Sequence, residues 1–455
     1  MNSRIRSNAQ TRLPLFADGD DSKNLHVGPA NNNANRLSEE DRPFHAWYRF
    51  VLSFPPHLVA NYIDEFGLER RHLLLDPFCG TGTTLVEAKL RDVPAIGLEA
   101  NPFPCFASSV KTDWSIESDE LEVWAHRVAA EALGILQSQG IDDCAFSDGT
   151  PGELPLQTLD AETTKLLITD SISPMPLHKT LVLLARLKEH RTGCFYRNGL
   201  LALGNALASS IGNLRFGPEV GVGKIKKDVP VVASWLAEVD KMCRDLRQLP
   251  VRDYPVVKLY QSDARVVSQV LAPSSVDGVI TSPPYPNEKD YTRTTRLESA
   301  VLGFVNSRSQ LKSLKRQLLR SNTRGVYKGD EDDAWVRANA AVQTISEEIE
   351  KRRIELGKTS GFERLYGKVT RLYFGGMARH LSDLRTVLRP GARLAYVVGD
   401  QASYLKVMIH TGSILADIAR VLGYEFIRAD PFRTRFATAT KEQLREEVVV
   451  LRWPG

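Results

Sequence analysis

A short apolar strand that runs into a glycine-rich turn and then a helix constrains this chain more than any other feature. Residues 72–76 are His-Leu-Leu-Leu-Asp, residues 77–84 are Pro-Phe-Cys-Gly-Thr-Gly-Thr-Thr, and a helical pattern begins at Leu85. A second apolar segment, residues 94–98, ends at Glu99. Strand, glycine turn, helix and strand in this order predict a parallel α/β sheet that meets a ligand at the turn.

Further apolar segments predict the remaining strands of this sheet: residues 256–260, 276–280, 393–398, 424–427 and 447–451. Two long stretches interrupt the alternation of strands and helices, and both are predicted to be mainly helical insertions. The N-terminal residues are polar, include three consecutive asparagines and lack periodicity, so we expect a flexible arm there. The predicted organisation is an arm (1–40), an α/β domain (41–112, 251–292 and 366–455) and two insertions (113–250 and 293–365).

Composition narrows the class of protein. The chain has 455 residues, 59 Lys and Arg against 55 Asp and Glu, and a net charge of +4, which is compatible with a nucleic-acid partner. Its five cysteines are scattered without a Cys-x-x-Cys pair, which argues against a disulfide framework or a zinc cluster, and no metal site is expected. The N-terminus lacks an apolar leader, and the longest apolar stretch, residues 200–211, is interrupted by Gly204 and Asn205. We expect a cytoplasmic protein without a membrane span.

The glycine turn does not match the common nucleotide motifs. In the dinucleotide motif a third glycine would stand at Leu85, and no Gly-Lys-Ser or Gly-Lys-Thr follows for a phosphate loop. Gly80 and Gly82 can still let the backbone approach a ligand closely. Glu99 follows Gly80 by 19 residues, at a strand end where a carboxylate can accept both hydroxyls of a ribose. The glycine pair alone is equally compatible with a tight turn that only packs a helix on the sheet.

The segment Thr281-Ser282-Pro283-Pro284-Tyr285 follows the predicted strand 276–280. Two prolines remove two N–H donors and fix two φ angles, so the loop is stiff and presents carbonyl acceptors. The Ser282 hydroxyl adds an acceptor, and Tyr285 offers an aromatic face on which a base can stack. This loop therefore predicts a pocket for a flat ring that carries an amino group.

Taken together, these motifs resemble those of S-adenosylmethionine-dependent amino-methyltransferases that act on DNA. The resemblance rests on residues 76–84, Glu99, Asp263 and residues 281–285, and it extends to residues 44–56 and 389–398. It covers about half of the chain and implies a Rossmann-like class I methyltransferase sheet, and the two mainly helical insertions lie outside it.

The resemblance also implies roles for individual residues. Gly80 and Gly82 would flank the methionine end of S-adenosylmethionine, Glu99 would hold the ribose, and Asp263 would contact the adenine amino group. Ser282, Pro283, Pro284 and Tyr285 would hold the target base. The complete set of expected cofactor-binding residues is Phe54, Pro55, Asp76, Phe78, Gly80, Thr81, Gly82, Thr83, Glu99 and Asp263.

The predicted reaction is methyl transfer to an exocyclic amino group of double-stranded DNA, with the base flipped out of the stack. Within the family, serine at the first position of the loop goes more often with cytosine N4 than with adenine N6, so cytosine is favoured. An RNA amino-methyltransferase acting on guanine N2 or adenine N6, and an inactive homologue that only binds nucleic acid, remain alternatives. A cognate restriction or defence component is a possible partner.

A second methyltransferase chemistry has a weaker basis. Pro104-Cys105 matches the Pro-Cys nucleophile of cytosine-C5 methyltransferases, but it follows Glu99 too closely to lie on the loop after the fourth strand. We interpret Cys105 and Cys79 as packing residues.

Two clusters of positive charge are candidate DNA contacts. Nine Lys or Arg and two Asp or Glu lie between Arg293 and Asp330, and Lys224, Lys226 and Lys227 follow the segment 213–218. The first cluster is equally compatible with a solvated helix face, and the second is equally compatible with a structural turn between helices.

Overall fold

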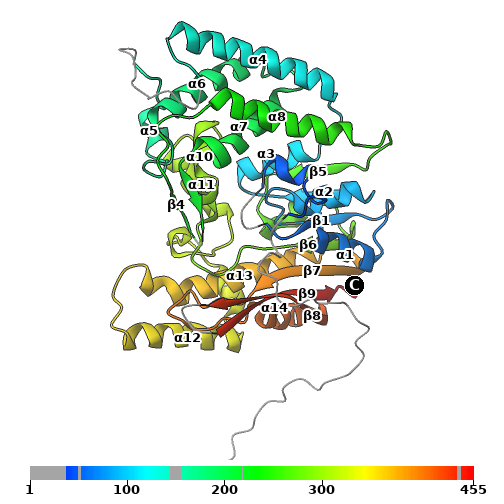
Figure 1. The fold of residues 1–455 in the computed structure, drawn as a ribbon. Coiled ribbons are helices and arrows are strands. Elements are labelled where there is room, and N and C mark those ends of the chain that lie inside the picture. Colours follow the sequence, from blue (N-terminus) through cyan, green and yellow to red (C-terminus); the bar gives the residue numbers. More distant parts are fainter. Residues whose placement is uncertain (1–36, 50–52, 144–154, 218, 438–441) are drawn as a thin grey trace, which may run out of the picture.

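The computed structural model describes residues 37–49, 53–143, 155–217, 219–437 and 442–455. Its centre is a seven-stranded sheet (Figure 1) in the order β5-β2-β1-β6-β7-β9-β8. The strands are β1 Leu74–Asp76, β2 Ala95–Leu98, β5 Val257–Tyr260, β6 Val276–Thr281, β7 Leu388–Gly399, β8 Glu425–Ala437 and β9 Glu442–Arg452. Neighbours from β5 to β7 are parallel, whereas β9 runs antiparallel to both β7 and β8. The predicted Rossmann-like α/β sheet is confirmed.

The strand bounds differ most from prediction at the C-terminus. The segments predicted at 424–427 and 447–451 extend into the long hairpin β8–β9. The missed part of β8 contains Arg428, Asp430 and Arg433, which obscure an apolar pattern. Because β8 is the edge of the sheet, charged side chains are tolerated there and protect the unpaired edge. The first strand begins at Leu74, two residues later than predicted.

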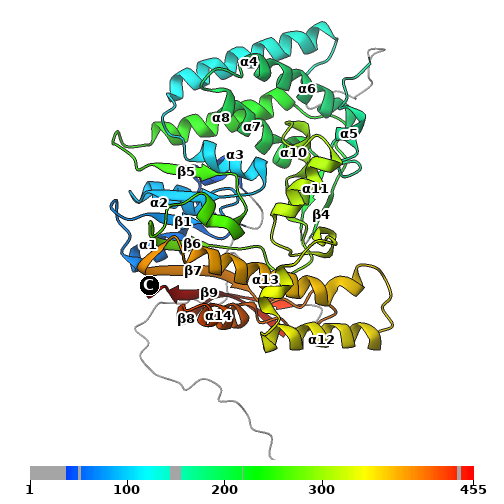
Figure 2. The same cartoon turned by 180° about the vertical axis from the view of Figure 1, so that it is seen from behind.

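Helices cover both faces of the sheet (Figures 1 and 2). Successive strand residues point to opposite faces, so Leu74 packs in the core cluster that contains α1 and α2, and Leu75 packs in the cluster that contains α13 and α14. The carboxyl ends of the parallel strands are left free for a ligand. The helices that flank the sheet are α1 Pro56–Phe66, α2 Thr83–Leu90, α3 Pro102–Lys111, α13 Tyr366–Leu384 and α14 Thr411–Val421.

The first insertion forms a helical layer above the sheet in Figure 1. Its helices are α4 Ser118–Ser138, α5 Ala161–Thr164, α6 Pro174–Glu189, α7 Tyr196–Ala206 and α8 Val231–Arg247. Their core contains the buried Trp124 and Trp235, and it also takes in Trp47 from the N-terminal segment and Leu297 from the second insertion. The glycine-rich break in this insertion forms a small antiparallel hairpin, β3 Leu214–Phe216 and β4 Val220–Val222.

The second insertion consists of short helices that follow β6. They are α9 Tyr291–Thr294, α10 Arg296–Val301, α11 Arg308–Gln317 and α12 Ala340–Glu355, with 3₁₀ turns η4 Thr323–Gly325, η5 Asp332–Val336 and η6 Glu363–Leu365. Helix α12 packs beside α13 (Figure 2). The domain boundaries proposed from the sequence stay a prediction.

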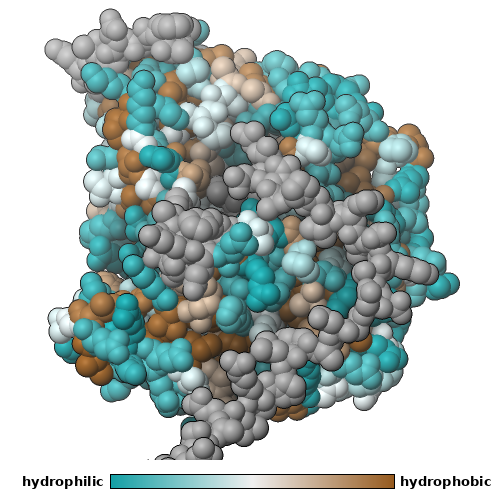
Figure 3. Space-filling model, turned by 60° about the horizontal axis from the view of Figure 1, so that its bottom comes forward, coloured by the Kyte–Doolittle hydropathy of each residue, from teal (hydrophilic) through white to brown (hydrophobic). Residues whose placement is uncertain are grey.

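Apolar residues are scattered among polar ones on the face shown in Figure 3. Within the described part of the chain, every helix is too short or too polar to cross a membrane. The predicted flexible arm, residues 1–40, lies outside the described residues up to residue 36, as do residues 50–52 of the segment 44–56.

Candidate active site

A cavity of about 240 Å³ lies where the loops after β1, β2, β5 and β6 converge. The predicted residues that line it are Phe54, Phe78, Gly80, Thr81, Thr83, Glu99, Asp263, Ser282, Pro283, Pro284 and Tyr285. Asn287, Asp290 and Tyr291 from the loop after β6 line it as well. Residues that are distant in the sequence are brought together because parallel strands end at one edge of the sheet. Pro55, Asp76 and Gly82 do not line the cavity, and the roles of all these residues stay predictions.

The glycine turn has a backbone that favours glycine at two positions. Gly80 has φ +51°, and nothing lies within 4 Å of the place where a Cβ would stand. Gly82 has φ +82°, and a Cβ there would lie 2.9 Å from Oγ of Ser108 on α3. Gly82 therefore allows the turn to pack on α3, while Gly80 keeps the cavity side of the turn open.

Glu99 bridges the turn and the second strand. One carboxylate oxygen accepts a hydrogen bond from the backbone N–H of Gly80 (3.1 Å), and the other accepts one from the N–H of Asn101 (2.7 Å). Burial raises the pKa of Glu99 to about 7, although both N–H groups favour the charged form. The carboxylate is thus held at the edge of the cavity with lone pairs left for a ligand.

Asp76 is the last residue of β1 and does not line the cavity. It is fully buried, and its Oδ1 accepts hydrogen bonds from the Thr281 hydroxyl (2.6 Å) and from the Phe78 N–H (3.1 Å). Burial raises the pKa of this carboxyl to about 6. Asp76 therefore connects the glycine turn to the strand end that precedes Ser282. Pro55 is also buried, directly before the first residue of α1.

Asp263 has a partner that the sequence did not suggest. Its carboxylate accepts from the Arg265 guanidinium, with Nη2 to Oδ2 at 2.6 Å and Nε to Oδ1 at 3.0 Å. Arg265 also pairs with Asp332 of the second insertion. Both Asp263 and Arg265 line the cavity, so Arg265 holds the carboxylate that the resemblance assigns to the adenine. Because Asp332 lies 67 residues away, no local pattern could indicate this pairing.

The Ser-Pro-Pro-Tyr loop is held from several sides. The Ser282 hydroxyl donates to the carbonyl of Val397 (3.2 Å), and the Tyr285 N–H donates to the Tyr291 hydroxyl (3.0 Å). The Tyr285 ring packs on Gly399, where a Cβ would come within 3.1 Å of the ring. A side chain at position 399 would displace the ring, so this glycine helps to keep Tyr285 in place.

The cysteine thiols are not poised as nucleophiles. Burial raises the pKa of Cys105 to about 12, with a contribution from Glu99, and it holds the pKa of Cys79 well above the usual range. A thiolate is the reactive form of cysteine, so neither residue favours covalent catalysis.

Some of the basic residues in the second insertion are engaged within the protein. Lys315 pairs with Asp290 at 2.6 Å, and the buried Arg320 pairs with Asp330 at 2.7 Å. Lys315 thus ties the insertion to the loop after β6, Arg320 stabilises the insertion itself, and both line the active-site cavity. Other basic side chains remain exposed: Arg308, Lys312, Arg316, Arg324 and Lys328.

The hairpin of the first insertion shows a similar division. Asn213 is buried and donates to the carbonyl of Asp170 (3.0 Å), and Lys226 donates to the carbonyls of Ser210 and Gly212. Both residues fix the hairpin. Arg215, Lys224 and Lys227 remain exposed, and Pro218 lies outside the described residues. The hairpin reaches the loop after β6, because Phe216 and Val220 share a small cavity with Glu288 and Arg293.

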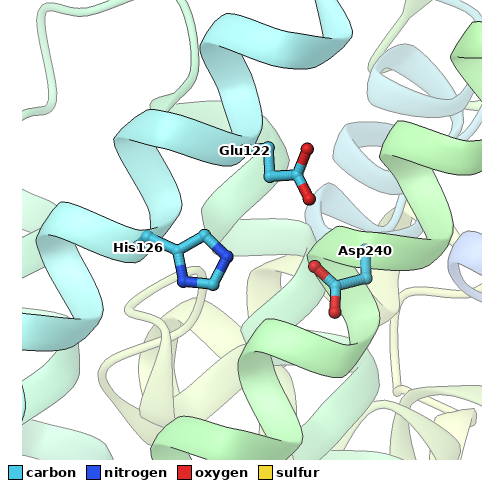
Figure 4. Close-up of side chains that lie close together, drawn as sticks. All are labelled: Glu122, His126 and Asp240. Carbon is cyan, nitrogen blue, oxygen red and sulfur yellow. The ribbon is translucent and has the colours of Figure 1, made fainter.

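Among the described residues, one group of side chains has the composition of a metal site (Figure 4). Glu122 and His126 lie one turn apart on α4 and face Asp240 on α8, with their ligand atoms within 4.8 Å of one another. The Glu122 carboxylate already pairs with Arg247. The group lies in the helical insertion and does not line the active-site cavity.

Comparison with known proteins gives relatives that match most of the chain. It is 25% identical to the type II methyltransferase M.BsoBI of Geobacillus stearothermophilus, over 95% of this chain and 89% of that protein. It is 22% identical to the type II methyltransferase M.AvaI of Anabaena variabilis, over 89% of this chain and 84% of that protein. No protein-family model matches the chain.

A solved structure, TrmN from Thermus thermophilus, aligns with 90% of this chain and 52% of its own, at 11% identity and a TM-score of 0.29. The two sequence relatives are more informative, because their identities are 25% and 22% and the alignments cover 89% and 84% of their own lengths. The resemblance suggested by the motifs is thereby confirmed, and this chain is a homologue of the type II DNA methyltransferases.

Proposed function

We propose that this protein transfers a methyl group from S-adenosylmethionine to the exocyclic amino group of a flipped base in double-stranded DNA, at cytosine N4 in preference to adenine N6. The observation that carries this proposal is the single cavity that joins Glu99 to the loop Ser282–Tyr285. Methyl transfer requires the donor and the acceptor nitrogen to meet in one enclosed space.

The polar atoms beside the glycine turn fit such a cofactor. Thr81 and Asn101 are buried and line the cavity, and Oγ1 of Thr81 and Oδ1 of Asn101 have no hydrogen-bond partner among the described residues. Buried polar atoms are nearly always paired in proteins. A ligand with ribose hydroxyls and an amino-acid end would supply these partners, and Glu99 would accept from the ribose. Phe54 and Phe78 add apolar surface to the same cavity.

The Ser-Pro-Pro-Tyr loop fits an amino-bearing base. Since the Ser282 proton is donated to Val397, the Ser282 oxygen is left to accept a hydrogen from the base amino group. The Pro283 carbonyl would accept the second one. These bonds favour a pyramidal nitrogen, whose lone pair is then less delocalised into the ring. Tyr285 would stack on the flipped base. When bound, S-adenosylmethionine supplies a methyl group on a positively charged sulfur.

The remaining features support DNA as the substrate. Exposed cations lie on α11 of the second insertion, part of which lines the cavity, and on and beside the hairpin β3–β4, which shares a small separate cavity with the loop after β6. These cations would neutralise phosphates. The relatives are type II methyltransferases. We propose that this protein protects DNA as part of a restriction-modification system.

The test is incubation of the protein with isotopically labelled S-adenosylmethionine and with unmethylated DNA or RNA, followed by nucleoside mass spectrometry. Label in N4-methylcytosine of DNA is expected. Label in N6-methyladenine alone would overturn the base preference and keep the reaction. Label only in RNA, or cofactor binding without transfer to either polymer, would overturn the proposed function.

A further inference from the structure

Arg433, on β8, carries a buried hydrogen-bond donor that nothing in the described part of the chain satisfies. The residue lines the active-site cavity, and its Nη2 donates to the Glu446 carboxylate on β9 at 2.5 Å. Its Nε is buried and has no hydrogen-bond partner among the described residues. An arginine keeps its proton in a protein, so this N–H cannot be neutralised, and a buried donor without a partner costs folding free energy. The unpaired Nε therefore indicates a missing acceptor.

A β-bulge turns this part of β8 toward the cavity. Pro431 and Arg433 pair with consecutive residues of β9, so Phe432 between them is an extra residue in the strand. Successive side chains of a regular strand point to opposite faces, yet Phe432 and Arg433 both line the cavity. Bulges re-aim side chains in this way and are frequent beside active sites. Regular pairing is thus interrupted at the place that brings Arg433 to the cavity.

The surroundings of Arg433 place it beside Tyr285. Its partner Glu446 pairs with Gly399 of β7, and a Cβ at position 399 would lie 3.1 Å from both the Tyr285 ring and Cγ of Glu446. Burial raises the pKa of Tyr285 well above its usual range, Glu446 raises it further, and Arg433 opposes the rise. Most residues assigned to the cofactor follow β1, β2 and β5, at the other side of the sheet. Arg433 therefore lies in the half of the cavity in which the proposed function places the target base.

We propose that the Nε–H of Arg433 donates a hydrogen bond to the flipped target base, at the acceptor next to the carbon that carries its amino group. This inference rests on the proposed function. Both amino hydrogens are taken by Ser282 and the Pro283 carbonyl, so the remainder of that edge of cytosine presents acceptors alone, of which N3 is the nearest to the amino group. Adenine presents N1 in the same relation to its amino group.

Arg433 would thereby act as a specificity-determining residue. Thymine and uracil carry an N–H at N3, and guanine carries one at N1, so each of these bases would place a donor against the donor of Arg433. Both groups would then be left unpaired in a buried site, which disfavours the wrong base. The ion pair with Glu446 holds the guanidinium in place before the base arrives.

The experiment compares a natural target base with an analogue that lacks the acceptor. Sequencing of DNA methylated by the wild-type protein first identifies the target base. Binding is then measured for a duplex with the target cytosine and for one with 3-deazacytosine, in which a C–H group replaces N3; for an adenine target, 1-deazaadenine replaces adenine. S-adenosylhomocysteine, which has no methyl group to transfer, keeps the DNA unmodified. The duplex preference is the affinity for the natural duplex divided by the affinity for the analogue.

Arg433→Met keeps a long unbranched side chain and removes the donor. This variant should lower the duplex preference by about tenfold or more relative to the wild-type protein, and it should lower kcat/KM for natural DNA by a similar factor. Its affinity for S-adenosylmethionine should stay within about threefold of wild type. The analogue also pairs more weakly with guanine and flips more easily, but this effect is common to all the proteins and cancels when their preferences are compared.

Arg428→Met is the matched control. Arg428 lies on the same strand and pairs with Glu65 and Asp430, but it does not line the cavity. The control thus loses a guanidinium and its ion pairs, as Arg433→Met does, and it should keep the duplex preference of the wild-type protein. Thermal melting should show that both variants are folded. An equal loss of preference in the two variants would overturn the inference.

The remaining outcomes are also decisive. An Arg433→Met protein that keeps the wild-type duplex preference would show that Arg433 only supports the pocket, however low its activity, and the inference would be wrong. If this variant instead weakens cofactor binding and leaves the preference unchanged, the donor serves the cofactor, which overturns the inference as well. A wild-type protein that methylates no DNA would overturn the proposed function itself, which separates that failure from a failure at Arg433 alone.

Discussion

The Glu99 carboxylate accepts a hydrogen bond from the backbone N–H of Gly80 at 3.1 Å, across the gap between two neighbouring strand ends. The contact makes the acidic residue part of the glycine turn's own structure before any ligand binds. Its second oxygen is engaged by the Asn101 N–H. One carboxylate thus organises the two loops to which the cofactor is assigned.

Replacing Glu99 by glutamine should weaken binding of S-adenosylmethionine. Glutamine offers one oxygen acceptor where the carboxylate offers two, so either the Gly80 or the Asn101 N–H must lose its partner. We expect a loss of about 1–3 kcal/mol in binding free energy. Isothermal titration calorimetry measures it, with Ser282→Ala as a control that should bind the cofactor normally. Unchanged affinity in Glu99→Gln would contradict the assignment.

Cofactor affinity should depend on pH through the same residue. In the free protein burial raises the pKa of Glu99 to about 7, so the group is partly protonated near neutrality. Ribose hydroxyls donate to the charged form of Glu99. Cofactor affinity should therefore increase with pH, by up to about tenfold per pH unit, until the pH reaches this pKa, and it should level off at higher pH. Titrations between about pH 5.5 and 8.5 check this, and Glu99→Gln should remove the dependence.

The raised pKa has an opposite effect on folding. The native state holds the Glu99 proton more tightly than the unfolded chain, so this group's contribution to stability is present at low pH. It is lost as pH rises from about 4.5 to about 7.

Ser282→Ala and Tyr285→Ala should abolish methyl transfer while leaving cofactor binding largely intact. The first removes an acceptor for the base amino group, and the second removes a stacking face, which is worth about 1–3 kcal/mol per base in other proteins. Methylation rates and calorimetric cofactor affinities, measured on the same preparations, separate the two effects. Full methylation rates in both variants would show that the proposed mechanism is wrong.

Charge reversal at exposed cations should weaken DNA binding in a salt-dependent manner. DNA affinity falls as salt rises, so a plot of log affinity against log salt has a negative slope. Arg324→Glu on the second insertion and Lys224→Glu beside the hairpin should each make this slope shallower by about one. Arg127→Glu, an exposed arginine on α4, serves as the control and should leave the slope unchanged. Identical slopes in all the proteins would exclude these surfaces as phosphate contacts.

Treatment with a chelator should not reduce methyl transfer. In the proposed reaction the sulfonium sulfur departs as a neutral thioether when its methyl group is transferred, so the reaction has no need for a Lewis acid. Glu122, His126 and Asp240 lie in the helical insertion, away from the cavity lining. Activity assays before and after dialysis against EDTA provide the measurement. A loss of activity that added metal restores would contradict the expectation and point to the Glu122 cluster, for which His126→Ala is the decisive variant.

Local motifs predicted the central fold and part of the lining of the cavity, because a strand, its turn and the next helix are adjacent in sequence. The pairings made by tertiary packing could not be predicted in this way. Arg265 pairs with Asp332 in the second insertion, and Asn322 donates a hydrogen bond to the carbonyl of Lys289. Both contacts depend on how a long insertion folds back over the sheet. The sequence also overstated the free charge near the site, since Arg320 is buried against Asp330.

The pairing of β1 with β6 has a consequence for how such proteins diversify. Leu74 lies opposite Gly278 and Leu75 opposite Val279, although about two hundred residues separate them along the chain. The distance between the glycine turn and the Ser-Pro-Pro-Tyr loop is thus set by adjacent strands, and the intervening polypeptide does not determine it. The entropy of closing a connection rises only with the logarithm of its length. The region between the two motifs can therefore lengthen or shorten while the glycine turn and the Ser-Pro-Pro-Tyr loop keep their places beside each other.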